Sequence, residues 1–191
     1  MSPFLIYVVG CPGAGKGTLC KLLAAEYDCH HISVGDLLRE LVDGPEQRYP
    51  DLKVHLKNGT LVPTATILSI LKEHVDKVPD TCRAVIVDGF PREVEQGKAA
   101  EKHLGKPHFV FSFKCEESEA EIRYLSRGRG NDNKELFKRR YQEFEDQYSA
   151  LEKYFLEMGV LVRLDTNGKT DENYRLLSIV FKARLNRLHG S

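Results

Sequence analysis

Residues 4–18 read FLIYVVGCPGAGKGT, and they carry the strongest signal for the fold in the chain. Phe4–Val9 is a continuous apolar run, which predicts a strand buried on both faces. Residues 10–16 then follow the pattern G-x-x-x-x-G-K at the start of a predicted helix. Glycines allow successive backbone N–H groups to converge on phosphate oxygens, and the helix adds the positive end of its dipole. Gly17 stands where the strict pattern has Ser or Thr, and the hydroxyl comes one residue later, at Thr18. The stretch predicts a nucleotide-binding strand–loop–helix unit.

Short apolar runs alternate with helical patterns along the rest of the chain. Further strands are predicted by four such runs, at residues 30–32, 84–87, 109–113 and 160–164. Aromatic and apolar residues of 137–155 recur at spacings of 4 and 3, which predicts one long amphipathic helix packed on the core. Residues 171–188 predict a closing helix, and residues 35–80 predict two or three helices inserted without a strand. This alternation predicts right-handed crossovers and a parallel sheet.

Composition narrows the class of protein. The 191 residues suit a single domain, and 28 Lys plus Arg balance 28 Asp plus Glu, which excludes a surface that tracks nucleic acid. The overall neutrality conceals a local excess of positive charge, because residues 123–140 contain seven Lys or Arg and only two acidic residues, Asp132 and Glu135. No apolar run is long enough for a membrane span, so no membrane partner is expected. Five cysteines without a CxxC pair predict free thiols and a cytoplasmic protein.

Two places in the sequence raise the question of a metal ion. Because Thr18 is displaced from the usual Mg²⁺-ligating position, Asp88, at the end of a predicted strand, is the candidate anchor for Mg²⁺, directly or through water. His30 and His31 are neighbours in a predicted strand, so their side chains point to opposite faces. No carboxylate or cysteine completes a site with them in the sequence pattern, and we expect structural histidines.

Five motifs, in order, resemble those of the nucleoside monophosphate kinases, the family that includes adenylate kinases and UMP-CMP kinases. They cover nearly the whole chain, at residues 10–18 (GxPGxGKGT), 31–39 (H-x-S-x-G-D-L-L-R), 58–63 (ending L-V-P), 88–96 (D-G-F-P-R-x-x-x-Q) and 123–133 (paired arginines and G-R-x-x-D-N).

The resemblance implies an α/β, P-loop three-layer fold with a five-stranded parallel sheet. Within the single domain 1–191 it implies a helical monophosphate-binding lobe at 33–63 and a short lid at 127–134. It also implies Mg·ATP-dependent, reversible phosphoryl transfer to a nucleoside monophosphate, with ATP + AMP = 2 ADP favoured. ATP and Mg²⁺ are the implied cofactors, two small nucleotides are the partners, and we expect a monomer.

Site residues follow from the same resemblance. The catalytic set is Lys16, Arg92, Arg129 and Arg140. The ATP-binding set is Gly13, Ala14, Gly15, Lys16, Gly17, Thr18, Arg123, Arg127 and Gly168. The acceptor-binding set is Val34, Arg39, Thr60, Leu61, Val62, Gly89, Phe90, Pro91, Arg92, Gln96, Arg129 and Arg140. Arg139 and Arg140 are adjacent, so only one can face the site, and motif spacing favours Arg140.

Three alternatives stay open. Gln96 is typical of AMP acceptance in the family, whereas Val34 lacks the hydroxyl that many adenylate kinases have there, so a UMP-CMP kinase is the nearest alternative. The second is a nucleotide-binding regulatory module whose shortened lid no longer supports turnover, and the third is a kinase of another small acceptor. The lid lacks a four-cysteine zinc knuckle, so no structural metal is expected. We hypothesise that so short a lid admits water and permits slow ATP hydrolysis without an acceptor.

Overall fold

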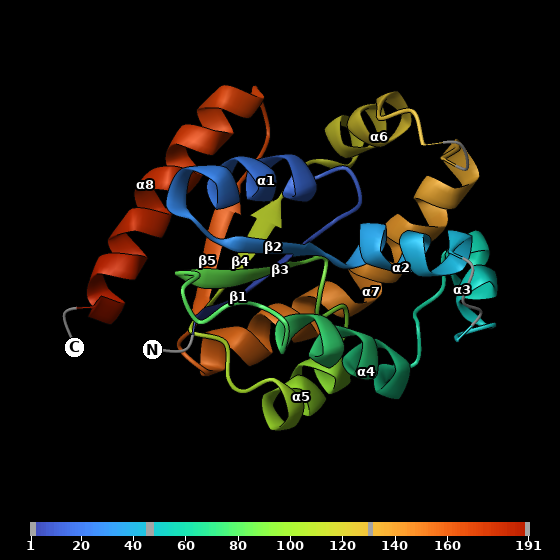
Figure 1. The fold of residues 1–191 in the computed structure, drawn as a ribbon. Coiled ribbons are helices and arrows are strands. Elements are labelled where there is room, and N and C mark those ends of the chain that lie inside the picture. Colours follow the sequence, from blue (N-terminus) through green and yellow to red (C-terminus); the bar gives the residue numbers. More distant parts are fainter. Residues whose placement is uncertain (1–2, 45–47, 130–131, 190–191) are drawn as a thin grey trace.

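The structure, a computed structural model, describes residues 3–44, 48–129 and 132–189. In these ranges five parallel strands form one sheet in the order β2-β3-β1-β4-β5, surrounded by eight helices (Figure 1). In chain order the elements are β1 (Phe4–Gly10), α1 (Lys16–Tyr27), β2 (His30–Ser33), α2 (Val34–Asp43), α3 (Leu52–Asn58), α4 (Thr64–Val75), β3 (Ala84–Asp88), α5 (Val94–His103), β4 (Phe109–Lys114), α6 (Glu117–Ser126), α7 (Lys134–Glu157), β5 (Leu161–Asp165) and α8 (Thr170–His189).

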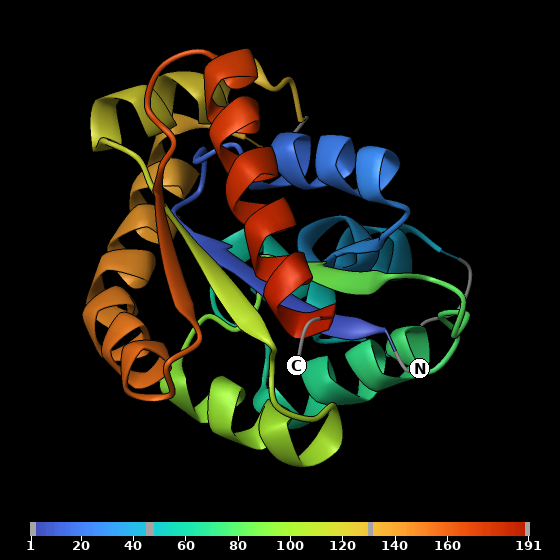
Figure 2. The same ribbon diagram turned by 90° about the vertical axis from the view of Figure 1, so that its left-hand side faces the viewer.

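The sheet is the middle of three layers. Helices α1 and α8 lie on one face, and α4, α5 and the carboxyl half of α7 lie on the other (Figures 1 and 2). Successive side chains of β1 point to opposite faces, so Tyr7 joins the cluster under α4 and α5 while Ile6 and Val8 join the cluster under α1 and α8. Both faces of the central strand are therefore buried, as its continuous apolar run predicts.

The topology places a binding site at the carboxyl ends of the central strands. From β1 the chain moves to β2 and β3 on one side of the sheet, and later to β4 and β5 on the other. Ligands in open α/β sheets bind where the strand order reverses in this way. In the register of β1 and β3, Val8 lies opposite Asp88, so β3 ends beside the start of the glycine-rich loop.

The predicted elements and the observed ones agree closely. Each predicted strand is present, with ends that differ by no more than one residue, and the periodic stretch 137–155 lies within the single helix α7. Ser33 caps α2, because its hydroxyl accepts a hydrogen bond of 3.4 Å from the Asp36 backbone N–H. Three helices, α2 to α4, occupy the region without a strand run. None of the helices formed by the described residues has the length and apolar character that crossing a bilayer requires.

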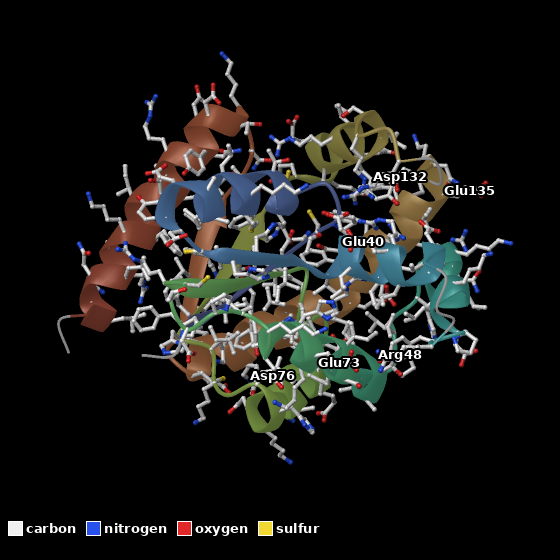
Figure 3. The ribbon with its side chains drawn as sticks, viewed as in Figure 1. Glu40, Arg48, Glu73, Asp76, Asp132 and Glu135 are labelled. Carbon is white, nitrogen blue, oxygen red and sulfur yellow. The ribbon has the colours of Figure 1, made fainter. Side chains whose placement is uncertain are left out.

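The connection between α2 and α3 is tied to α4 by an ion pair. Arg48 donates to the Glu73 carboxylate through both terminal nitrogens, at 3.2 and 3.0 Å (Figure 3). Residues 45–47 of the predicted lobe, and Gly130 and Asn131 of the predicted lid, lie outside the described residues. The boundaries of lobe and lid therefore stay predictions.

Candidate active site

The loop between β1 and α1 needs glycine for both conformation and space. Gly13 and Gly15 adopt φ values of +89° and +81°, which side chains other than hydrogen rarely permit. A Cβ on Gly13 would lie 2.0 Å from the backbone oxygen of Ala120 in α6. The loop is thus held against α6, with the amino end of α1, which begins at Lys16, directed into the site.

Lys16 is folded back onto its own loop. Its Nζ donates hydrogen bonds of 2.7 Å to the carbonyl oxygens of both Gly10 and Cys11. Burial lowers the pKa of Lys16, and the nearby Asp88 carboxylate acts against that shift. The ammonium group is therefore positioned at the loop, where it can exchange two carbonyl partners for phosphate oxygens.

A cavity of about 580 Å³ opens above this loop. It is bordered by the loop, the start of α2, the end of β3, α6 and α7. Among the described residues that line it, eight carry positive charge and three carry negative charge, which gives a local excess of +5. The cationic residues are Lys16, Lys21, Arg39, Arg92, Arg123, Arg127, Arg129 and Arg140, and the acidic residues are Asp36, Asp88 and Glu143. Such a cavity suits a ligand with several negative charges.

Arg140, one of two adjacent arginines in α7, faces this cavity. Its two terminal nitrogens donate to the Tyr124 hydroxyl at 3.0 Å and to the Leu56 carbonyl at 3.2 Å. Arg139 is exposed and does not line the cavity. The structure therefore places Arg140 toward the cavity and Arg139 in solvent, in agreement with the motif spacing.

Arg39 and Arg92 border the same part of the cavity from α2 and from the loop after β3. Arg39 pairs with Asp36, one turn earlier in α2. The Arg92 side chain is accessible from the cavity, and its Nε donates to the Gly89 carbonyl at 3.3 Å. Removal of water from around the guanidinium by neighbouring protein atoms, and then the positive charge of Arg140, lower the pKa of Arg92. Guanidinium groups gathered in this way are stabilised when an anion binds between them.

Arg123 and Gly168, both predicted on the ATP side, are joined directly. Arg123 donates to the carbonyl oxygens of Thr166 at 2.7 Å and Gly168 at 2.5 Å, and it pairs with Glu119 at 2.9 Å. Gly168 is the one predicted site residue, among those described, that lines neither cavity of the site. Its position is set through Arg123, which does line the large one.

The segment between α6 and α7 supplies two more arginines. The Arg127 guanidinium lies 3.9 Å from the centre of the Tyr124 ring and pairs with Asp132, which Figure 3 shows near the entry to α7. Arg129 reaches across the cavity mouth and pairs with Asp36 of α2 at 2.8 Å. The predicted lid is therefore in contact with the predicted monophosphate lobe.

A second, smaller cavity of about 40 Å³ adjoins the large one. It is lined by residues of the predicted acceptor set, namely Val34, Arg39, Thr60, Leu61, Val62, Gly89, Phe90, Arg92, Gln96 and Arg140. Pro91 lines the large cavity instead. Gln96 is only 2% exposed, accepts a hydrogen bond of 3.0 Å from the Arg92 backbone N–H and donates one of 3.5 Å to the Val62 carbonyl. Its amide is thereby held at the wall of this pocket.

Asp88 fits a magnesium ligand by chemistry and by place. It is the last residue of β3, it lines the large cavity, and one carboxylate oxygen lies 3.4 Å from the position that a Cβ on Gly17 would take. A carboxylate is the type of oxygen ligand that Mg²⁺ takes in nucleotide sites. Gly17 has no side chain to fill the space beside this carboxylate. The carboxylate therefore borders the space in which phosphates would bind.

Helix α7 contributes side chains that the sequence patterns did not single out. Glu143 accepts a hydrogen bond of 3.0 Å from the Leu61 backbone N–H, and burial raises its pKa. Phe144 and Tyr148 line the large cavity and are half-buried. Phe144 also packs against the core, as predicted, whereas the prediction of core packing is wrong for Tyr148. Glu143 and Phe144 lie three and four residues after Arg140, on the same helix face, and that spacing could have identified them.

A phosphate loop under a cationic cavity, with a second pocket next to it, defines a nucleoside monophosphate kinase. The family model described as adenylate kinase matches residues 8–160, and the chain belongs to the adenylate kinase family. It is 33% identical over 175 residues to adenylate kinase isoenzyme 1 of Gallus gallus, with 90% of each chain covered. It is also 33% identical to that isoenzyme of Caenorhabditis elegans (91% and 85% covered) and 32% identical to that of Homo sapiens (87% and 88% covered).

Proposed function

We propose that the protein catalyses the reversible reaction ATP + AMP = 2 ADP. The observation that carries the proposal is the placement of Arg39, Arg92 and Arg140, which line both the large cavity and the small pocket. A phosphoryl group that passes between two nucleotides needs dense positive charge at the boundary between their sites. The curated relatives named above, all adenylate kinases, support AMP as the acceptor.

The donor nucleotide lies on the phosphate loop in this proposal. Backbone N–H groups of residues 13–18 bind its phosphates, and Lys16 leaves its two carbonyl partners to bind them as well. Arg123 and Gly168 contact the adenine side of ATP, and Arg127 contacts its phosphates. Asp88 would hold Mg²⁺, which when bound neutralises part of the phosphate charge and orients the phosphates for transfer.

The acceptor phosphate lies between Arg39 and Arg92 in this proposal. Arg129 and Arg140 act on the transferring group, where planar guanidinium forks match the phosphoryl oxygens. No side chain needs to form a covalent bond, because the reaction depends on alignment of the two nucleotides and on stabilisation of charge. The Arg129–Asp36 pair keeps one of these guanidinium groups above the cavity before substrate binds.

Gln96 is the residue on which the choice of acceptor rests. A carboxamide presents a donor and an acceptor side by side, which matches the pattern on the edge of adenine. Val34, 2% exposed in the same pocket, contributes an apolar wall. Both residues border the pocket in which the acceptor base would lie.

The test is a comparison of kcat/KM for AMP, UMP, CMP and GMP with Mg·ATP as donor. We expect AMP to exceed each of the others by at least about tenfold, the effect of one discriminating hydrogen bond of about 1.4 kcal/mol. A preference for UMP or CMP would contradict the proposal and favour a UMP-CMP kinase. Binding of nucleotides without turnover of any of the four would favour a regulatory module. The monomeric state, the cytoplasmic location and slow hydrolysis without an acceptor stay predictions.

A further inference from the structure

Behind the phosphate loop, three side chains with metal-binding atoms meet in the protein interior. Cys20 comes from α1, His31 from β2 and Asp88 from β3, and one ligand atom from each lies within 4.8 Å of the other two. Cys20 is fully buried, and the His31 and Asp88 side chains are 10% and 6% exposed. The expectation that no carboxylate or cysteine accompanies His31 is therefore wrong, because its partners come from elements that only the fold brings together.

The sheet register explains why these side chains meet. His31 lies opposite Ile86 and Ser33 lies opposite Asp88 in the parallel pairing of β2 with β3. Ile86 belongs to the cluster packed under α1, and side chains two residues apart in a strand point to the same face, so Asp88 also points toward α1. Cys20 lies in that helix and belongs to the same cluster. All three groups thus occupy the layer between the sheet and α1.

The arrangement fits a tetrahedral metal ion. Ligands at ordinary zinc–nitrogen and zinc–oxygen lengths would be about 3.4 Å apart in a tetrahedron, and His31 Nε2 lies 3.3 Å from the Asp88 carboxylate. A zinc thiolate would lie about 3.6 Å from each, so each distance from the Cys20 sulfur to the other two ligand atoms has to shorten by no more than about 1.2 Å. A thiolate and a carboxylate together cancel the charge of a divalent cation, which makes the complex compatible with a buried position.

We propose that Cys20, His31 and Asp88 form a binding site for a thiophilic divalent cation of the Zn²⁺ type. When that cation is bound, Asp88 is no longer available as a ligand for Mg²⁺. Binding releases one proton, since the buried thiol becomes a metal-bound thiolate while the imidazole coordinates in its neutral form. Mg²⁺ prefers oxygen ligands alone, whereas Zn²⁺ prefers the mixed sulfur, nitrogen and oxygen set, so the two ions compete for one carboxylate. Of the three residues, Asp88 also lines the large cavity, so the site adjoins the space in which the phosphates would bind.

Cobalt titration of the metal-free protein tests the site itself. Co²⁺ replaces Zn²⁺ in tetrahedral sites and gives a thiolate-to-cobalt absorption band in the near ultraviolet, together with visible bands typical of four-coordination. We expect one equivalent of Co²⁺ to produce these bands and one equivalent of Zn²⁺ to remove them. Cys20→Ser should abolish the thiolate band, and Cys29→Ser, at a half-buried cysteine near the end of α1 and outside the cluster, should keep it. Absence of the band in the wild type, or its persistence in Cys20→Ser, would overturn the proposal.

A second measurement tests the competition, which rests on the proposed function. Zn²⁺ should inhibit phosphoryl transfer in the wild type, and excess Mg²⁺ should relieve the inhibition. Cys20→Ser should retain Mg²⁺-dependent activity and require at least about tenfold more Zn²⁺ for the same inhibition, because loss of even an outer-shell partner of a ligand costs about 10- to 100-fold in metal affinity. Equal sensitivity of variant and wild type would refute the competition. Because cobalt binding is read without substrate, failure of the proposed reaction would leave the spectroscopic result unaffected.

Discussion

Replacement of Arg140 by Ala, compared with replacement of its neighbour Arg139, tests whether the guanidinium groups of the cavity act in phosphoryl transfer. Both residues lie on α7, but only Arg140 lines the two cavities, and both of its terminal nitrogens are within hydrogen-bond distance of the site wall. A hydrogen bond that involves a charged group contributes about 1.5–3 kcal/mol. Two such bonds to the transferring phosphoryl group amount to about 3–6 kcal/mol, and each 1.36 kcal/mol changes the rate tenfold.

We therefore expect Arg140→Ala to lower kcat/KM for AMP with Mg·ATP by about 100- to 10,000-fold. The melting temperature should change by only a few degrees, because loss of the bonds to Tyr124 and Leu56 is offset by relief of the repulsion between Arg140 and Arg92. Arg139→Ala, which removes an exposed charge, should stay within about threefold of the wild type. The assay is steady-state kinetics with a thermal melt of each variant. Losses of similar size in the two variants would show that Arg140 has no special role in phosphoryl transfer.

Three further predictions concern the loop and the contact between lid and lobe. Lys16→Met should lower kcat at least about 100-fold without loss of the native circular dichroism spectrum, because it removes one charge from the reacting centre. Native-like activity of this variant would exclude the proposed mechanism. Gly13→Ala should lower the melting temperature by about 5–20 °C, since a positive φ and a 2.0 Å approach to a backbone oxygen together destabilise by about 2–6 kcal/mol. Gly128→Ala, at a positive φ with open space around it, should lose less than half as much. Burial raises the pKa of Asp36, but its arginine partners and Ser33 outweigh that effect and lower it. Its contribution to stability is therefore present above about pH 4 and lost as the pH falls through the folded-state pKa, so melts of Asp36→Asn should fall below those of the wild type at pH 7, and the difference should shrink as the pH falls below about 4. A difference that does not shrink as the pH falls below about 4 would contradict this assignment.

The fold could be predicted from the sequence because its signals are local. A strand buried on both faces needs a continuous apolar run, and Phe4–Val9 supplies one next to a loop whose glycines are required by conformation. The long helix α7 was predictable for a similar reason, since its spacing of 4 and 3 persists over five turns. The five-stranded parallel sheet followed from the resemblance, which covers nearly the whole chain, whereas the strand order came only from the structure.

Site residues that belong to a motif could be predicted from the sequence. Site residues whose position depends on packing between elements were missed. Arg140 could be chosen over Arg139 from motif spacing, and the structure places it at both cavities. Glu143 belongs to no motif; its spacing from Arg140 places it on the same helix face, but its hydrogen bond with Leu61 depends on how α7 packs. The meeting of His31 with Cys20 and Asp88 depends on sheet register and helix packing, which a single sequence does not specify.

The most direct test follows the transferred phosphoryl group itself. The protein is incubated with Mg²⁺, ATP labelled at the γ-phosphate and unlabelled AMP, and the products are separated. We predict that the label moves to the β-phosphate of newly formed ADP, in amounts equal to the AMP consumed. Label found only in inorganic phosphate, or transferred to UMP or CMP but not to AMP, would contradict the proposal that this chain is an AMP-directed phosphotransferase.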